Sequence, residues 1–168
     1  LSEIDQAVEF GRQHGMHVSI NLHRAPGFCI NPPAEPFNLW KDSEPLEAFC
    51  LYWRTFAERY KGIGAEQLSF NLINEPRDPA SNGDAEKMTR ADYIRVMSAA
   101  AEAIRAVDPD RQIIVDGLGC GRVPVDALAA KGMAQSTRAY QPLSVSHNQA
   151  SWCNCPEGWV EAAWPGKD

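Results

Sequence analysis

The sequence predicts an α/β fold in which parallel strands alternate with amphipathic helices. Four short apolar runs are each followed by polar or turn-forming residues, and segments with helical periodicity lie before and between them. Strands and helices that alternate in this way form a parallel sheet that the helices cover. We therefore expect every strand to end at the same edge of one sheet.

The helical segments carry apolar residues at every third or fourth position. In the second segment Leu46, Phe49, Trp53 and Phe56 fall on one face, so Trp53 is predicted to belong to the core. Capping residues and glycines or prolines bound the segments, and alanines support the third. We expect helices over residues 2–14, 44–60 and 89–107, with Thr89 or Asp92 starting the third, and a short helical segment over 125–130.

The predicted strands are residues 16–22, 68–73, 112–116 and 143–146. Because parallel strands end at the same edge, polar residues that follow them should form a shared site. A proline-rich loop, residues 28–43, follows the first strand, and loops of that length inside a domain commonly carry function. The polar residues after three of the strands are His23 and Arg24, then Asn74 and Glu75, then His147 and Asn148.

Two architectures fit this order of elements, an open doubly wound sheet and part of a closed barrel. The open sheet commonly has a glycine-rich phosphate turn after its first strand, but residues 23–27 are not such a turn, and no Walker loop is present. The barrel is therefore favoured. A complete TIM-type (β/α)8 barrel needs about 250 residues. We expect residues 1–168 to be a single incomplete barrel domain, a fragment whose remaining strands belong to missing parts of the same chain.

Composition argues against several classes of partner. The formal charge is -6 and lysines and arginines form no cluster, which argues against nucleic acid and anionic membrane surfaces. No apolar stretch approaches the roughly 20 residues of a membrane span. Residues 1–5 have neither the basic start nor the apolar core of a signal peptide, so none is expected in this fragment. The compartment stays open between secreted and cytoplasmic.

The cysteines and histidines do not form a pattern typical of a metal site. Five cysteines cannot all pair, and Cys153 and Cys155 are too close for an easy bridge and lack the second half of a zinc knuckle. We expect reduced thiols. The remaining ligand set, His23, His147 and Glu75, contains no spaced histidine pair. No metal and no cofactor are therefore predicted.

The tripeptide Asn74-Glu75-Pro76 at the end of the second strand indicates carboxylate chemistry. A glycosidic oxygen leaves poorly unless it is protonated, and a Glu can supply that proton. Asn74 could hold the sugar 2-hydroxyl. Trp40, Trp152 and Trp164 lie in loops at the same end, where indoles could stack on sugars or pack the loops onto the barrel rim. Glu75 could alternatively be a structural carboxylate paired with Arg24 or Arg77.

Three segments together resemble glycoside hydrolase family 5, the cellulase-type branch of the retaining barrel glycosidases. They are residues 20–27, 72–76 and 146–152, and the resemblance covers essentially the whole chain. It implies a (β/α)8 barrel of which this chain spans roughly the third to sixth strands. It implies that Glu75 is the acid/base, that Asn74 contacts the sugar at the cleavage point, that His23 lines that subsite, and that His147 ends the sixth strand. The candidate substrate-binding residues are His23, Arg24, Asn74, His147, Asn148, Trp40 and Trp152.

The resemblance also implies groups that this chain does not supply. Family members often place a Tyr shortly after the active-site His, but Asn148 and Gln149 stand here. The family nucleophile is a second Glu after the seventh strand, and Glu157 and Glu161 are not in such a setting. We expect a retaining hydrolase of β-linked glucan or related oligo- and polysaccharides. The alternatives are a non-catalytic carbohydrate-binding barrel and another barrel enzyme with Glu75 as base, such as an isomerase or metal-dependent hydrolase.

Overall fold

The computed structural model describes residues 1–77 and 88–153. The chain divides into two compact units, residues 1–137 and residues 138–168, and each has its own internal packing. The predictions that concern Cys155, Glu157, Glu161 and Trp164 lie outside the described residues. No helix in the described part of the chain is long and apolar enough to span a bilayer.

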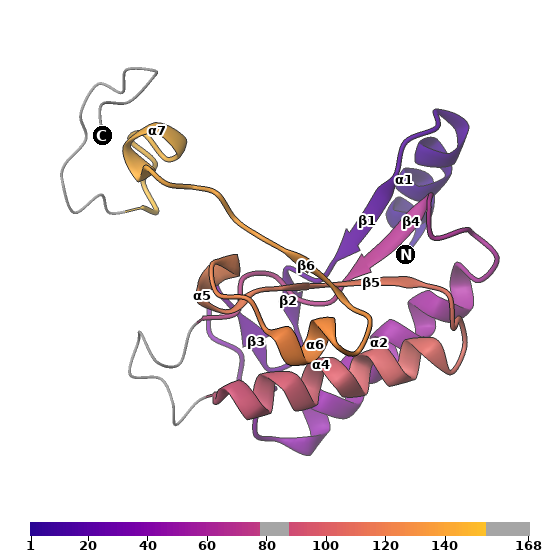
Figure 1. The fold of residues 1–168 in the computed structure, drawn as a ribbon, viewed down its shortest axis with the longest axis horizontal. Helices are drawn as coiled ribbons and strands as arrows, with labels where there is room; N and C mark the ends of the chain where they lie inside the picture. The colour runs from indigo at the N-terminus through magenta and orange to yellow at the C-terminus, as the bar shows by residue number, and fades with distance from the viewer. Residues whose placement is uncertain (78–87, 154–168) are drawn as a thin grey trace. The chain divides into compact units, whose positions relative to one another are not determined.

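The first unit is built on a parallel sheet with the strand order β1-β4-β5-β6 (Figure 1). In its register Ile20 lies beside Phe70, and Phe70 lies beside Ile113. A small antiparallel pair, β2 with β3, follows the first strand. The strands are β1 Val18–Asn21, β2 Arg24–Ala25, β3 Phe28–Cys29, β4 Leu68–Asn71, β5 Gln112–Asp116 and β6 Ala134–Ser136.

The helices of this unit are α1 Ser2–Gln13, α2 Ser43–Arg59, α4 Arg90–Arg105, α5 Leu118–Gly121 and α6 Asp126–Ala129. The long helices α2 and α4 pack against each other below the sheet in Figure 1. Helix α4 starts where the sequence predicts, because the Thr89 hydroxyl accepts the N–H of Asp92 at 3.1 Å and the Asp92 carboxylate accepts the N–H of Thr89 at 2.8 Å. The predicted alternation of helices with parallel strands is confirmed.

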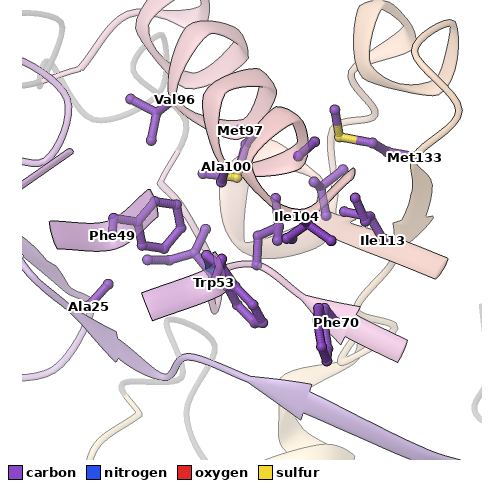
Figure 2. Close-up of a cluster of buried hydrophobic side chains, with 14 of the residues drawn as sticks. Ala25, Phe49, Trp53, Phe70, Val96, Met97, Ala100, Ile104, Ile113 and Met133 are labelled. Atoms are coloured by element: carbon purple, nitrogen blue, oxygen red, sulfur yellow. The ribbon is translucent and has the colours of Figure 1, made fainter. Parts of the chain in front are cut away.

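Trp53 of α2 lies at the centre of the core between helices and sheet (Figure 2). Its indole is fully buried, and its ring centroid lies 5.2 Å from that of Phe70 and 5.6 Å from that of Phe56. Aromatic rings at this separation add to the hydrophobic contribution of their burial. Ile104 of α4 and Ile113 of β5 belong to the same cluster. This packing fixes β4, and with it the position at which β4 ends.

The prediction of a strand over residues 143–146 is wrong. These residues form the helical turn α7 Leu143–Ser146 of the second unit, in which the N–H of His147 donates to the carbonyl of Leu143 at 2.9 Å. Pro142 precedes this turn, where its missing N–H costs no hydrogen bond. Val145 is exposed, so the alternation of apolar and serine residues here does not correspond to a buried strand face.

The fourth strand of the sheet is β6, which the sequence analysis does not predict. The side chain of Gln135 accepts the N–H of Val125 at 2.8 Å and donates to its carbonyl at 2.9 Å. A polar residue therefore stands where an apolar one would indicate a strand. This strand is stabilised by its pairing with β5, in which Ile114 lies beside Ala134. Its sequence has no apolar pattern that would predict it.

Candidate active site

The segment that leaves β4 is held by two neighbouring strands. The N–H of Asn74 donates to the carbonyl of Leu22, just after β1, at 3.1 Å. The N–H of Glu75 donates to Oδ2 of Asp116, the last residue of β5, at 2.9 Å. The backbone at the proposed acid/base is thus tied to the strand on each side of β4.

Glu75 itself has a left-handed backbone conformation, with φ of 49°. A residue other than glycine pays roughly 1–2 kcal/mol to adopt it. Such conformations persist where surrounding contacts enforce them, and they cluster at functional sites. The next residue is also held in place, because the carbonyl of Pro76 accepts the N–H of Cys120 at 2.9 Å. Glu75 as a whole residue is partly exposed.

Asp116 is a site residue that the sequence analysis misses. It is fully buried, and its Oδ1 accepts from Nδ2 of Asn71 at 3.0 Å. Its backbone carbonyl accepts from the hydroxyl of Tyr93 at 2.5 Å. One signal was available in the sequence, since a carboxylate that ends an apolar run must find hydrogen-bond donors if it is buried.

Cys120 lies in α5, a turn in which Gly119 and Cys120 are both left-handed. Burial raises the pKa of the Cys120 thiol, and the negative charge of Glu75 raises it further. The thiol is the less nucleophilic form of cysteine. Both effects favour the protonated thiol of Cys120 over the thiolate. Within the described residues no group of three or more His, Cys, Asp or Glu side chains could hold a metal ion.

Arg24 fastens the loop that follows β3. Its guanidinium forms an ion pair with Glu35 and donates to the carbonyls of Asn31 at 3.2 Å and Pro33 at 3.1 Å. These contacts make Glu35, not Glu75, the ion-pair partner of Arg24. His23 precedes it, is exposed, and directly follows the Leu22 that bonds to Asn74.

A pocket of about 680 Å³ opens among the residues of this loop. Small-molecule sites commonly have volumes of about 300–1,000 Å³. Arg77, two residues after Glu75, is part of the pocket wall, so the pocket borders the segment that leaves β4. Its wall includes Phe28, Ile30, Pro32, Glu35, Phe37 and Trp40.

The structure favours packing over stacking for Trp40. The side chain is 4% exposed, and its ring centroid lies 5.2 Å from that of Phe28 and 5.8 Å from that of Tyr93. Its backbone carbonyl also accepts from Arg95 at 2.6 Å. An indole held in this way packs its loop onto the domain, which is one of the two roles that the sequence leaves open for Trp40. A contact of Trp40 with substrate stays a prediction.

His147 follows the helical turn α7 and does not end a strand, contrary to the prediction. Its Nδ1 lies 2.8 Å from the hydroxyl oxygen of Ser146, and its ring meets that of Tyr140 edge to face at 4.9 Å. The aromatic neighbour of His147 thus comes from seven residues before it in the chain. Trp152 is 82% exposed, and Asn148 is also exposed. The structure brings His23, Asn74 and Glu75 to one sheet edge, and a shared site with His147, Asn148 and Trp152 stays a prediction.

Comparison with known protein families identifies the chain. The family model described as Cellulase (glycosyl hydrolase family 5) matches residues 1–161 of the 168. The chain belongs to glycosyl hydrolase family 5. The resemblance of its three motif segments to this family is thereby confirmed.

Two relatives in family 5 illustrate how much of a complete protein the chain represents. It is 26% identical over 151 residues to Cellodextrinase A of Ruminococcus flavefaciens, a match that covers 90% of this chain and 44% of the relative. It is 28% identical over 117 residues to Endoglucanase C of Acetivibrio thermocellus, covering 70% of this chain and 31% of the relative. The chain thus spans less than half the length of these relatives.

Solved structures give the same proportion. A crystal structure of a glycoside hydrolase superposes with a TM-score of 0.86 at 40% identity, over 96% of this chain and 48% of that one. Endoglucanase Cel5A of Thermotoga maritima superposes with a TM-score of 0.71 at 23% identity, over 99% of this chain and 49% of that one. The parallel sheet described above is therefore part of a family 5 barrel, as the sequence predicts.

Proposed function

We propose that this chain carries the proton-donating half of a retaining β-glycosidase active site. Glu75 is the acid/base, and the nucleophilic carboxylate comes from residues outside positions 1–168. Retaining hydrolysis uses two carboxyl groups about 5–5.5 Å apart. In our proposal the sheet β1-β4-β5-β6 carries one of them at the end of β4, and strands on the opposite side of the barrel carry the other.

In the first step the nucleophile attacks the anomeric carbon while Glu75 gives its proton to the departing glycosidic oxygen. The C–O bond breaks, and a covalent glycosyl-enzyme remains. In the second step the Glu75 carboxylate takes a proton from water as that water attacks the anomeric carbon. The nucleophile leaves as a carboxylate, and Glu75 regains its proton.

The observation that carries this proposal is the anchoring of Glu75. Its backbone is held in a left-handed conformation by Asp116, and the residue before it is bonded to Leu22. A proton donor must keep its reach to the leaving oxygen, because displacement of about 1 Å can cost roughly a hundredfold in rate. The partial exposure of the residue is consistent with a carboxyl that a substrate can reach.

The proposed substrates are β-linked glucans and related oligo- and polysaccharides. The family match and the relatives with the names cellodextrinase and endoglucanase support this class. In our proposal Asn74 holds the hydroxyl next to the anomeric carbon and His23 lines the same subsite. The pocket beside Arg77 has a volume suited to further sugar units.

The proposal is tested by comparing residues 1–168, a longer form with all eight strands, and the longer form with Glu75→Gln. Each is assayed on aryl β-glycosides and soluble glucans. We expect the longer form to hydrolyse both kinds of substrate and residues 1–168 to hydrolyse neither. The Glu75→Gln variant of the longer form should lose hydrolysis of soluble glucans and of aryl glycosides with poor leaving groups. Comparable turnover by residues 1–168 would show that they need no outside nucleophile. A longer form that binds glucan without hydrolysing it would favour the carbohydrate-binding alternative.

A further inference from the structure

We propose that Asp116 is the positioning residue for Glu75, and that it acts by holding the Glu75 N–H in the left-handed conformation. This inference rests on the proposed role of Glu75 as acid/base. Asp116 does not touch the substrate in this account. It acts through the backbone of the residue that does.

The geometry assigns a separate partner to each oxygen of the Asp116 carboxylate. Oδ2 accepts the Glu75 N–H at 2.9 Å, and Oδ1 accepts from Nδ2 of Asn71 at 3.0 Å. Asn71 is the last residue of β4 and Glu75 lies four residues after it, so one bond joins the end of β5 to the end of β4 and the other joins it to the segment that follows. The carboxylate thus spans the point at which the chain turns from strand to active-site segment.

Asp116 is itself held by the helix layer. The hydroxyl of Tyr93 in α4 donates to its backbone carbonyl at 2.5 Å, and both residues are fully buried. Burial raises the pKa of Tyr93, and the charge of Asp116 raises it further, so the phenol keeps its proton and stays a donor. The backbone of Asp116 is therefore held by α4, so its carboxylate offers the Glu75 N–H an acceptor in a fixed position.

A carboxylate is required at this place because both contacts need an acceptor. An amide has one acceptor oxygen and one NH₂ group. Asp116→Asn would turn a donor toward either the Glu75 N–H or the Nδ2 of Asn71. The Asn71 Oδ1, which is buried without a partner among the described residues, could accept the new donor only if the Asn71 amide turned over. A buried donor without an acceptor is destabilising, and so is the left-handed conformation of Glu75 without the bond that holds it.

The inference predicts a distinctive kinetic result in the longer, eight-stranded form. Asp116→Asn should lower kcat by about 10- to 100-fold through displacement of the acid. The loss should be larger for aryl glycosides with poor leaving groups, which depend on proton donation, than for those with good ones. A structural defect alone would lower the fraction of active enzyme equally for every leaving group, and titration of active sites corrects for that fraction.

A charge swap provides the second variant. In Asn71→Asp/Asp116→Asn the new amide can donate to the new carboxylate and still accept the Glu75 N–H through its oxygen. We expect the swap to fold and to have a kcat about tenfold higher than that of Asp116→Asn. A swap that folds and has the same low kcat as Asp116→Asn would overturn the inference. If Asp116→Asn does not fold, the kcat of the swap is compared with that of the wild type, and a roughly 10- to 100-fold deficit in the folded swap would overturn it.

The matched control is Asp108→Asn, which changes a largely buried carboxylate before the start of β5. Asp108 pairs with Arg111 at 2.7 Å and lies at the opposite end of that strand from Asp116. We expect this variant to lose stability and keep the wild-type dependence on leaving group. If Asp108→Asn and Asp116→Asn change that dependence equally, the inference is wrong.

Glu75→Gln separates this inference from the proposed function. If Glu75→Gln loses activity and Asp116→Asn keeps wild-type kcat and leaving-group dependence, the positioning role is contradicted and the acid role stands. If Glu75→Gln keeps wild-type activity on all leaving groups, the proposed function fails, and the inference fails with it.

Discussion

The N–H of Asn74 donates to the carbonyl of Leu22 across 3.1 Å, beyond the last pair of residues that register β1 with β4. The two strands therefore remain bonded as they leave the sheet. His23 follows one partner and Glu75 follows the other. His23 and Glu75 thus follow backbone segments that are hydrogen-bonded to each other and not independent loops. This bonding favours a fixed relative position of the two residues.

Asn74→Ala removes the side chain of Asn74 and keeps the hydrogen bond from its backbone N–H to Leu22, so it tests the side chain alone. We expect kcat to fall by about 10²–10³, the usual cost of losing one hydrogen bond made in the transition state. On a substrate that lacks the 2-hydroxyl at the cleaved sugar, the same substitution should cost little. An equal loss on both substrates would argue against a contact between Asn74 and that hydroxyl.

Trp40→Ala and Trp152→Ala should behave in opposite ways. Trp40 is 4% exposed, and its truncation should lower the free energy of unfolding by about 3–5 kcal/mol in urea denaturation. Trp152 is 82% exposed, and its truncation should change stability by less than about 0.5 kcal/mol while raising KM for long oligosaccharides. An unchanged KM would remove Trp152 from the substrate-binding residues.

Stability at low pH should reveal the capping box of α4. Burial alone would raise the pKa of Asp92, but hydrogen bonds from Lys41 and Thr89 outweigh it and lower that pKa to about 2. The pKa is depressed on folding, so this stabilisation is present above about pH 4 and is lost as the pH falls through about 2. Asp92→Asn should therefore destabilise the protein at pH 7.

The difference between wild type and Asp92→Asn should shrink between pH 4 and pH 2, which urea titrations at several pH values would measure. Thr89→Ala serves as the comparison, since it removes the other half of the cap at a cost of about 1 kcal/mol without removing a titrating group. A wild-type advantage over Asp92→Asn that stays constant down to pH 2 would contradict the assignment.

Much of the fold was predictable because burial leaves a periodic pattern. Residues 68–71 are all buried, and the apolar residues of the run 68–73 indicate β4. The stripe that includes Phe49 and Trp53 indicates the buried face of α2. The Asn-Glu-Pro motif likewise identified the end of β4. Each of these signals is local, and each depends on side chains that follow one another in the sequence.

The misses arise where pairing or distant contacts decide the structure. Strand β6 carries Gln135, whose amide bonds to Val125, so no apolar alternation announces it. Packing of Trp40 was one of its two expected roles, but the sequence does not reveal its partner Tyr93, which is more than fifty residues later. Asp116 reads as a simple strand end until its bond to the N–H of Glu75 is seen. Contacts between residues far apart in the chain leave no periodicity that one sequence can reveal.

The most direct test of the central claim is the dependence of Glu75→Gln on leaving group in the eight-stranded form. Formation of the glycosyl-enzyme should be nearly unaffected for an activated aryl glycoside whose phenol leaves without a proton. For a poor leaving group it should fall by about 10²–10⁴, the range attributed to general acid catalysis. A loss of the same size across the whole series would contradict the assignment of Glu75 as proton donor.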